Sequence, residues 1–135
     1  MSKAAELAAK LLTQRVETIE QIKNTPSTKL GVKNADGRPM RAVMRIMHDH
    51  EMSHLVQVQK TLQAIGHQPT EVQMILAQTM QARAALAAAI LSLSDEQLEA
   101  KPSPDTWSVR EVLEHIVRYD PVLIERIKTQ FEGAD

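Results

Sequence analysis

The residues of this sequence best suited to chemistry are two of its five histidines, spaced one helical turn apart. His50 and His54 lie within a stretch of 26 residues, 40–65, that contains no proline or glycine. On an α-helix, residues four apart share one face, so both imidazoles can reach the same ion. The pair therefore predicts a divalent metal site, and imidazole ligands leave zinc, nickel, iron and copper as candidates.

The pair is expected at the centre of an apolar stripe. At about 100° per residue, an apolar stripe forms around Val43, with Met47, Val58 and Ile65 within about 60° of it. His50 and His54 fall within roughly 20° of Val43, whereas His48 lies about 140° away. Two inward imidazoles need partners, which a metal or neighbouring polar groups would supply, and we favour the metal.

Glu51 gives the pair a second interpretation, because His50-Glu51-x-x-His54 matches the motif of zinc peptidases. Glu51 would then be the general base. The extended motif requires glycine and histidine where this chain has Gln57 and Lys60. A zinc peptidase is therefore the less favoured alternative, and Glu51 remains a candidate catalytic residue.

The elements that must position these residues are expected to be helices. The chain is rich in alanine, leucine, glutamine, glutamate and methionine and has one Phe, one Trp and one Tyr. Such a composition favours helices around an aliphatic core. We predict an all-α four-helix bundle, a single domain over residues 1–135. Its helices are expected at about 2–23, 40–65, 70–91 and 108–131, with a loop over 24–39, a tight turn over 66–69 and a one-turn helix within 93–106.

Local signals mark the helix ends. Thr70, Ser94 and Ser108 each precede a Gln or Glu by three residues, which predicts three capping boxes. Pro121 predicts a kink, with Asp120 capping a final segment. His115 lies two turns after Ser108, at the margin of an apolar stripe, so its spacing leaves its direction open.

Two motifs resemble the DinB-like (YfiT-like) four-helix metalloprotein family. The first motif runs from residue 50 to residue 69; it begins with His50-Glu-Met-Ser-His54 and ends with Gly66-His-Gln-Pro69. The second motif runs from residue 93 to residue 115. It consists of Leu93-Ser-Asp-Glu-Gln-Leu98, then Pro102, then Trp107-Ser108 through Glu111-Val-Leu-Glu-His115. The resemblance implies one metal held by His50, His54 and His115. It also implies a metalloenzyme scaffold, since some relatives are thiol-dependent transferases or isomerases and others are presumed hydrolases.

The order of the two motifs departs from that family, in which the Trp-Ser helix comes first and the H-x3-H helix comes last. The family bundle runs up-down-down-up, so the short turn over 66–69 could not join the exchanged halves within one bundle. We therefore predict an intertwined homodimer in which residues 1–66 pack on residues 70–135 of the partner. Each metal would take His50 and His54 from one chain and His115 from the other.

Composition excludes several other classes. The chain has no cysteine, which excludes a disulfide framework and a thiolate metal site. Its 16 basic and 17 acidic residues form no basic block, so no nucleic-acid partner is expected. No stretch approaches the about 20 apolar residues of a membrane span, and a cytoplasmic protein is expected.

The sequence thus predicts a metal-dependent transferase or hydrolase acting on a small molecule, with the substrate unknown. The alternative is a non-catalytic helical bundle for association or regulation, with a structural metal or none.

Overall fold

Helices are the regular elements of residues 1–133, the part of the chain that this computed structural model describes. The four long helices are α1 (Lys3–Ile22), α2 (Met40–Ala64), α3 (Glu71–Ile90) and α5 (Val109–Gln130). Two shorter ones are the 3₁₀ helix η1 (Ser27–Gly31) and α4 (Asp95–Glu99). The all-α class is confirmed, and the long helices begin and end close to the predicted residues.

All three predicted capping boxes form. The hydroxyls of Thr70, Ser94 and Ser108 each accept a hydrogen bond from the backbone N–H three residues later. In return, the Gln or Glu at that later position accepts one from the first residue's own N–H. The starts of α3, α4 and α5 are therefore fixed by local side chains, which satisfy N–H groups that have no partner within the helix.

The new helix start predicted at Asp120 is wrong, because α5 continues through Pro121 as one helix. The predicted kink at Pro121 stays a prediction. Proline lacks the N–H that would donate to Val117, but its fixed φ is compatible with helical backbone. One missing hydrogen bond is therefore tolerated here without a new helix start at Asp120.

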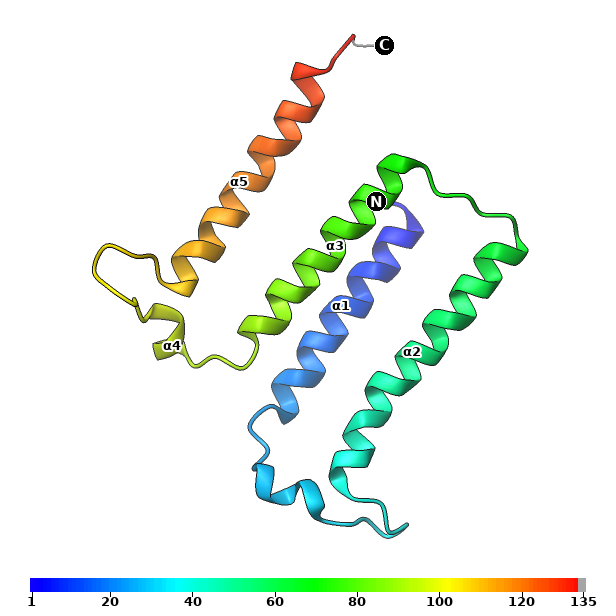
Figure 1. Cartoon of the computed structure of the whole chain (residues 1–135), viewed down its shortest axis with the longest axis vertical. Coiled ribbons are helices and arrows are strands. Elements are labelled where there is room, and N and C mark those ends of the chain that lie inside the picture. Colours follow the sequence, from blue (N-terminus) through cyan, green and yellow to red (C-terminus); the bar gives the residue numbers. More distant parts are fainter. Residues whose placement is uncertain (134–135) are drawn as a thin grey trace. The chain divides into compact units, whose positions relative to one another are not determined.

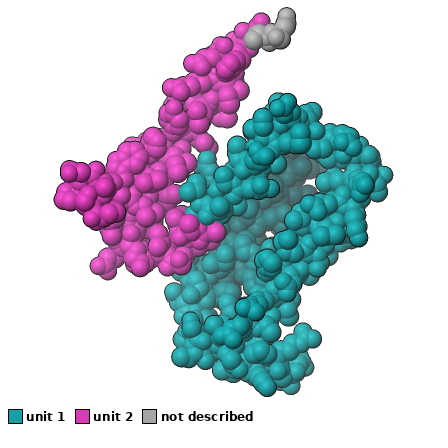
Figure 2. Space-filling model, in the orientation of Figure 1, with its two compact units in different colours: residues 1–87 teal, residues 88–135 magenta. Residues whose placement is uncertain are grey.

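The chain separates into two compact units, residues 1–87 and 88–135 (Figure 2). In the first unit, α1 and α2 run antiparallel and are joined by the loop that contains η1 (Figure 1). Asn34 closes a turn in this loop by accepting hydrogen bonds from the backbone N–H groups of Asp36 and Arg38, both 3.0 Å long. In the second unit, α4 packs against α5. The assignment of residues 1–135 to a single domain stays a prediction.

The predicted aliphatic core does not form within the single chain. Among residues 1–133 no apolar side chain is buried, and Ser108, at 1% exposure, is the one buried residue. Large apolar side chains remain well exposed, including Leu11 at 66% and Ile127 at 62%. Within their own unit His50 and His54 are exposed, because α2 packs against η1 and its apolar stripe is left uncovered. The enclosure of the two histidines in a core stays a prediction.

None of the described helices is both long enough and apolar enough to cross a lipid bilayer.

Candidate metal centre

The structure brings the rings of His50 and His54 together on one face of α2. Their Nε2 atoms are 3.1 Å apart, and their rings meet edge to face with centroids separated by 4.5 Å. Two imidazole nitrogens that each lie about 2.0–2.1 Å from one zinc ion are about 2.9–3.4 Å apart at ligand angles between 90° and 110°. The pair therefore has the nitrogen separation that two ligands of one ion require.

Gln57 determines which nitrogen of His54 is available. The Gln57 Oε1 atom lies 2.8 Å from His54 Nδ1. A carbonyl oxygen only accepts, so Nδ1 carries the proton, and in the neutral ring Nε2 keeps its lone pair. That Nε2 atom is the one that faces His50. Hydrogen bonding of the second ring nitrogen in this way is usual for histidine ligands of metals.

His115 lies on α5 in the second unit, between the rings of the chain's single tryptophan and single tyrosine. Its ring stacks on Tyr119, with centroids 5.6 Å apart and planes inclined by 20°. Trp107 approaches it at 52°, with centroids 5.1 Å apart. In the described part of the chain, no hydrogen bond or ion pair reaches either ring nitrogen of His115, so whichever nitrogen carries the lone pair can bind a metal.

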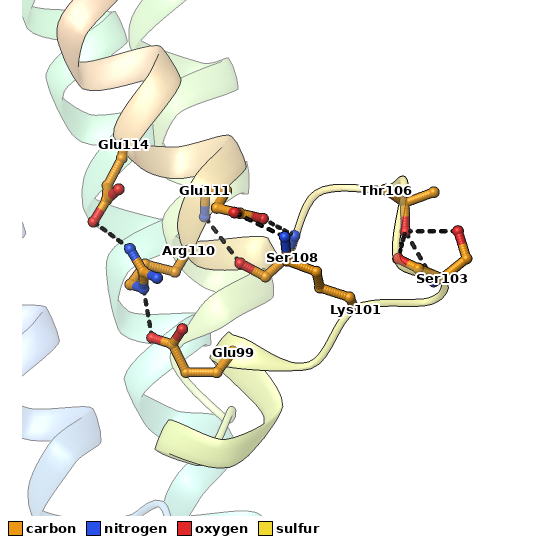
Figure 3. A network of polar contacts seen from close by, with 8 residues as sticks. All are labelled: Glu99, Lys101, Ser103, Thr106, Ser108, Arg110, Glu111 and Glu114. Carbon is orange, nitrogen blue, oxygen red and sulfur yellow. Dashed lines mark hydrogen bonds and ion pairs between the residues drawn. The ribbon is translucent and has the colours of Figure 1, made fainter.

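A polar network holds the start of the helix that carries His115 (Figure 3). Glu111 accepts a 2.7 Å hydrogen bond from the backbone N–H of Ser108 and forms a 3.0 Å ion pair with Lys101. These two contacts, that of Ser108 first, hold the pKa of Glu111 below its ordinary value. The network fixes the first turn of α5, one turn before His115.

A second part of the same network joins α4 to α5. Arg110 pairs with Glu99 and, at 2.8 Å, with Glu114 (Figure 3). The hydrogen bond from Arg110 lowers the pKa of Glu99, and the two carboxylates raise the pKa of the guanidinium. All three side chains are about half exposed, so the contribution of these pairs to stability is small.

Glu51, the candidate general base, forms an ion pair with Arg15 of α1. Its carboxylate is thereby engaged in the contact between α1 and α2. This arrangement weighs against the peptidase interpretation, in which Glu51 would activate a water molecule beside the histidine pair.

The predicted ligands are divided between the two units of the chain. His50 and His54 belong to residues 1–87 and His115 to residues 88–135. Within residues 1–133 no group of three His, Cys, Asp or Glu side chains converges as a metal site. His48 pairs with Asp49 at 3.1 Å and stays exposed, so it is not part of the histidine pair.

Four residues contact the candidate site residues without having been predicted to do so from the sequence: Arg15, Gln57, Trp107 and Tyr119. Gln57 and Tyr119 could have been found, because they follow His54 and His115 by three and four residues on their helices. Arg15 could not, since its contact joins residues 36 positions apart.

Comparison with known proteins decides the family of the second half of the chain. Residues 78–135 match the family model of the DinB superfamily. This part of the chain is similar to the DinB superfamily. The resemblance is confirmed for this segment, which contains Trp107, Ser108 and His115, whereas the His50–His54 pair lies before it.

The chain is also similar in sequence to the uncharacterized protein YuaE of Bacillus subtilis (strain 168). The two are 43% identical over 42 residues, which cover 31% of this chain and 26% of YuaE. The match thus spans about a quarter of the length of that relative. No solved structure matches the chain. The exchanged order of the two motifs stays a prediction.

Proposed function

We propose that this protein is a homodimeric, metal-dependent enzyme acting on a small molecule. Its metal would be a divalent ion such as zinc, nickel or iron, bound by His50 and His54 of one chain and by His115 of the partner subunit. The observation that carries the proposal is the 3.1 Å separation of the His50 and His54 Nε2 atoms. Gln57 supports it by leaving the His54 Nε2 lone pair free for a metal.

The exposed apolar surface supports the dimer. Large apolar side chains of the long helices remain exposed, among them Leu11 at 66% on α1 and Ile127 at 62% on α5. Extensive exposed apolar surface of this kind marks a face that binds another protein chain. A second copy would cover the apolar stripes of α1, α2, α3 and α5 and would enclose His50 and His54 as the sequence predicts.

The position of the DinB segment supports a site shared between chains. The segment carries His115 and begins at residue 78, after the H-x3-H helix. Only residues 65–70 separate α2 from α3. With so short a connection, exchange between two chains gives each DinB segment the H-x3-H helix of its partner.

Three imidazoles leave coordination positions open on a divalent ion. When bound, such an ion lowers the pKa of water or polarises a substrate oxygen or sulfur atom, which suits a hydrolase or a thiol-dependent transferase. In this proposal the three histidines bind the metal. Gln57 keeps the proton of His54 on Nδ1. The capping box at Ser108 fixes the first turn of α5, the helix that carries His115.

The first test is metal content, measured by elemental analysis of the purified protein. His50→Ala with His54→Ala, and His115→Ala by itself, should each lose the metal. His48→Ala and His67→Ala are matched controls and should retain it. If the wild-type protein carries no more metal than the His50→Ala/His54→Ala variant, the proposal fails and a non-catalytic bundle is the better interpretation.

The second test asks whether the ligands come from two chains. Differently tagged His50→Ala/His54→Ala and His115→Ala chains are produced together and the mixed dimer is isolated. A shared site predicts one restored metal per mixed dimer, because His50 and His54 of one chain meet His115 of the other. A site within one chain predicts no restoration, since every site then lacks at least one ligand.

A further inference from the structure

His115 differs from His54 in how its ring is oriented. His54 is held by a hydrogen bond from its second nitrogen, whereas neither nitrogen of His115 has a hydrogen-bond partner within residues 1–133. Its ring contacts are with Trp107 and Tyr119. The chain has one tryptophan and one tyrosine, and both contact this histidine.

The geometry of these contacts suits a metal ligand. The lone pairs of imidazole lie in the plane of the ring, so a neighbour stacked on a ring face restrains the ring without covering a nitrogen. Tyr119 stacks nearly parallel to His115, at 20°. The aromatic neighbours thus restrict the rotation of His115 and leave its nitrogens open.

Tyr119 is itself held in place by Arg126, two turns further along α5. Arg126 Nη1 donates a 3.1 Å hydrogen bond to the Tyr119 hydroxyl, and its guanidinium carbon lies 5.7 Å from the centre of the tyrosine ring. Trp107 precedes Ser108, the buried N-cap of α5, so its backbone is fixed by the capping box. The Tyr119 ring is therefore held independently of His115, and for Trp107 the backbone is held.

We propose that Trp107 and Tyr119 are positioning residues that hold the His115 ring in the orientation in which it binds the metal. This inference rests on the proposed function, because it requires His115 to be a ligand. Most metal-binding histidines are oriented by a hydrogen bond from their second ring nitrogen to an acceptor; here ring stacking orients His115 instead. A ring restrained before binding loses less conformational entropy when the metal arrives, which strengthens binding.

The test is Co²⁺ binding to the intact protein, followed by its visible absorption and by calorimetry. Tyr119→Leu and Trp107→Leu should each weaken binding about two- to tenfold, as expected for loss of one aromatic contact. Tyr119→Phe and Trp107→Phe retain a ring and should bind like the wild-type protein. In the weakened variants the visible bands should also change intensity, because His115 no longer holds one geometry around the ion.

A double-mutant cycle separates positioning from a structural role. In a His115→Ala background the cycle compares the weak residual binding of added Co²⁺ by His50 and His54. Removal of either ring should not weaken this residual binding further, whereas a general loss of structure would weaken it. If the leucine variants bind like the wild-type protein, or lose the same factor with and without His115, the inference is wrong. If wild type and His115→Ala bind Co²⁺ equally, the proposed function fails instead. Should Tyr119→Leu not fold, as judged by circular dichroism, Trp107→Leu carries the same test.

Discussion

The side chain of Gln57 accepts a hydrogen bond from Nδ1 of His54, at 2.8 Å, and thereby directs the lone pair of His54 Nε2 toward His50. All three residues lie on α2 within two turns, so this arrangement depends on one helix alone. The histidine pair is thus prepared by local structure, before any contact with another part of the chain.

Replacing Gln57 by leucine should weaken metal binding about tenfold or more, as loss of such a partner usually does. Without the acceptor, the proton of His54 is free to occupy Nε2 and block the lone pair. Gln57→Glu keeps the acceptor and should bind at least as tightly as the wild-type protein. Calorimetric titration with Zn²⁺ measures the change, with Gln59→Leu on the same helix as control. Equal affinity in Gln57→Leu and wild type would contradict this role.

Glu51→Gln should leave the metal content unchanged, because Glu51 pairs with Arg15 and is not one of the proposed ligands. The free energy of unfolding should fall by no more than about 1 kcal/mol, since both side chains are substantially exposed. Arg15→Gln should have the same effect, and the double variant no additional one. Urea denaturation provides the measurement. Peptidase activity that disappears in Glu51→Gln would revive the peptidase interpretation.

Ser108→Ala should lower the free energy of unfolding by about 1 kcal/mol, the usual cost of losing an N-cap. The buried Ser108 hydroxyl accepts from the Glu111 N–H at 3.2 Å, and alanine cannot replace that acceptor. Ser53→Ala, at an exposed position inside α2, is the matched control and should change stability by less than about 0.5 kcal/mol. Equal effects of the two substitutions would show that the capping box contributes nothing.

Stability should decrease in acid partly through Glu111. Its pKa in the folded chain lies below the ordinary value of 4.5, because the Ser108 N–H and Lys101 favour the charged form. A carboxyl group with a lowered folded pKa contributes stability that is complete above its unfolded pKa and lost as the pH falls through the folded value. Glu111→Gln should therefore flatten the decline in unfolding free energy below about pH 5. Glu17→Gln, on an exposed part of α1, should leave the slope as it is in the wild type.

Removal of the metal by a chelator should lower the melting temperature of the wild-type protein. An ion that binds only the folded dimer stabilises it by about 2.7 kcal/mol at a free concentration one hundred times its Kd. The His50→Ala/His54→Ala variant has no site, so the chelator should not change its melting temperature. Size-exclusion chromatography should show that the metal-free dimer is weaker, so that it already dissociates at protein concentrations at which the metal-bound dimer is intact. Identical melting with and without chelator would contradict metal-linked stability.

Much of the fold could be predicted because its determinants are local. The capping pairs at Thr70, Ser94 and Ser108, and the stop at Gly66, act over a few residues, so helix ends were predictable from spacing. The new helix start at Asp120 was wrongly predicted, since the ability of the surrounding helix to tolerate one missing hydrogen bond is not visible in the spacing. Tyr119 is predictable as a neighbour of His115 because it lies four residues later on α5, whereas the contact with Trp107, which precedes the helix, depends on side-chain rotamers.

The sequence by itself determined the helices, their caps and the common face of His50 and His54, because helical periodicity places residues four apart side by side. Only the tertiary structure decided that Glu51 pairs with Arg15, that Trp107 lies against His115, and that no apolar side chain among residues 1–133 is buried. These features depend on contacts between segments, or on side-chain rotamers, that no local pattern specifies. An apolar stripe indicates only that a helix face packs against other apolar side chains. Whether these side chains belong to the same chain or to a second copy depends on how the helices are connected.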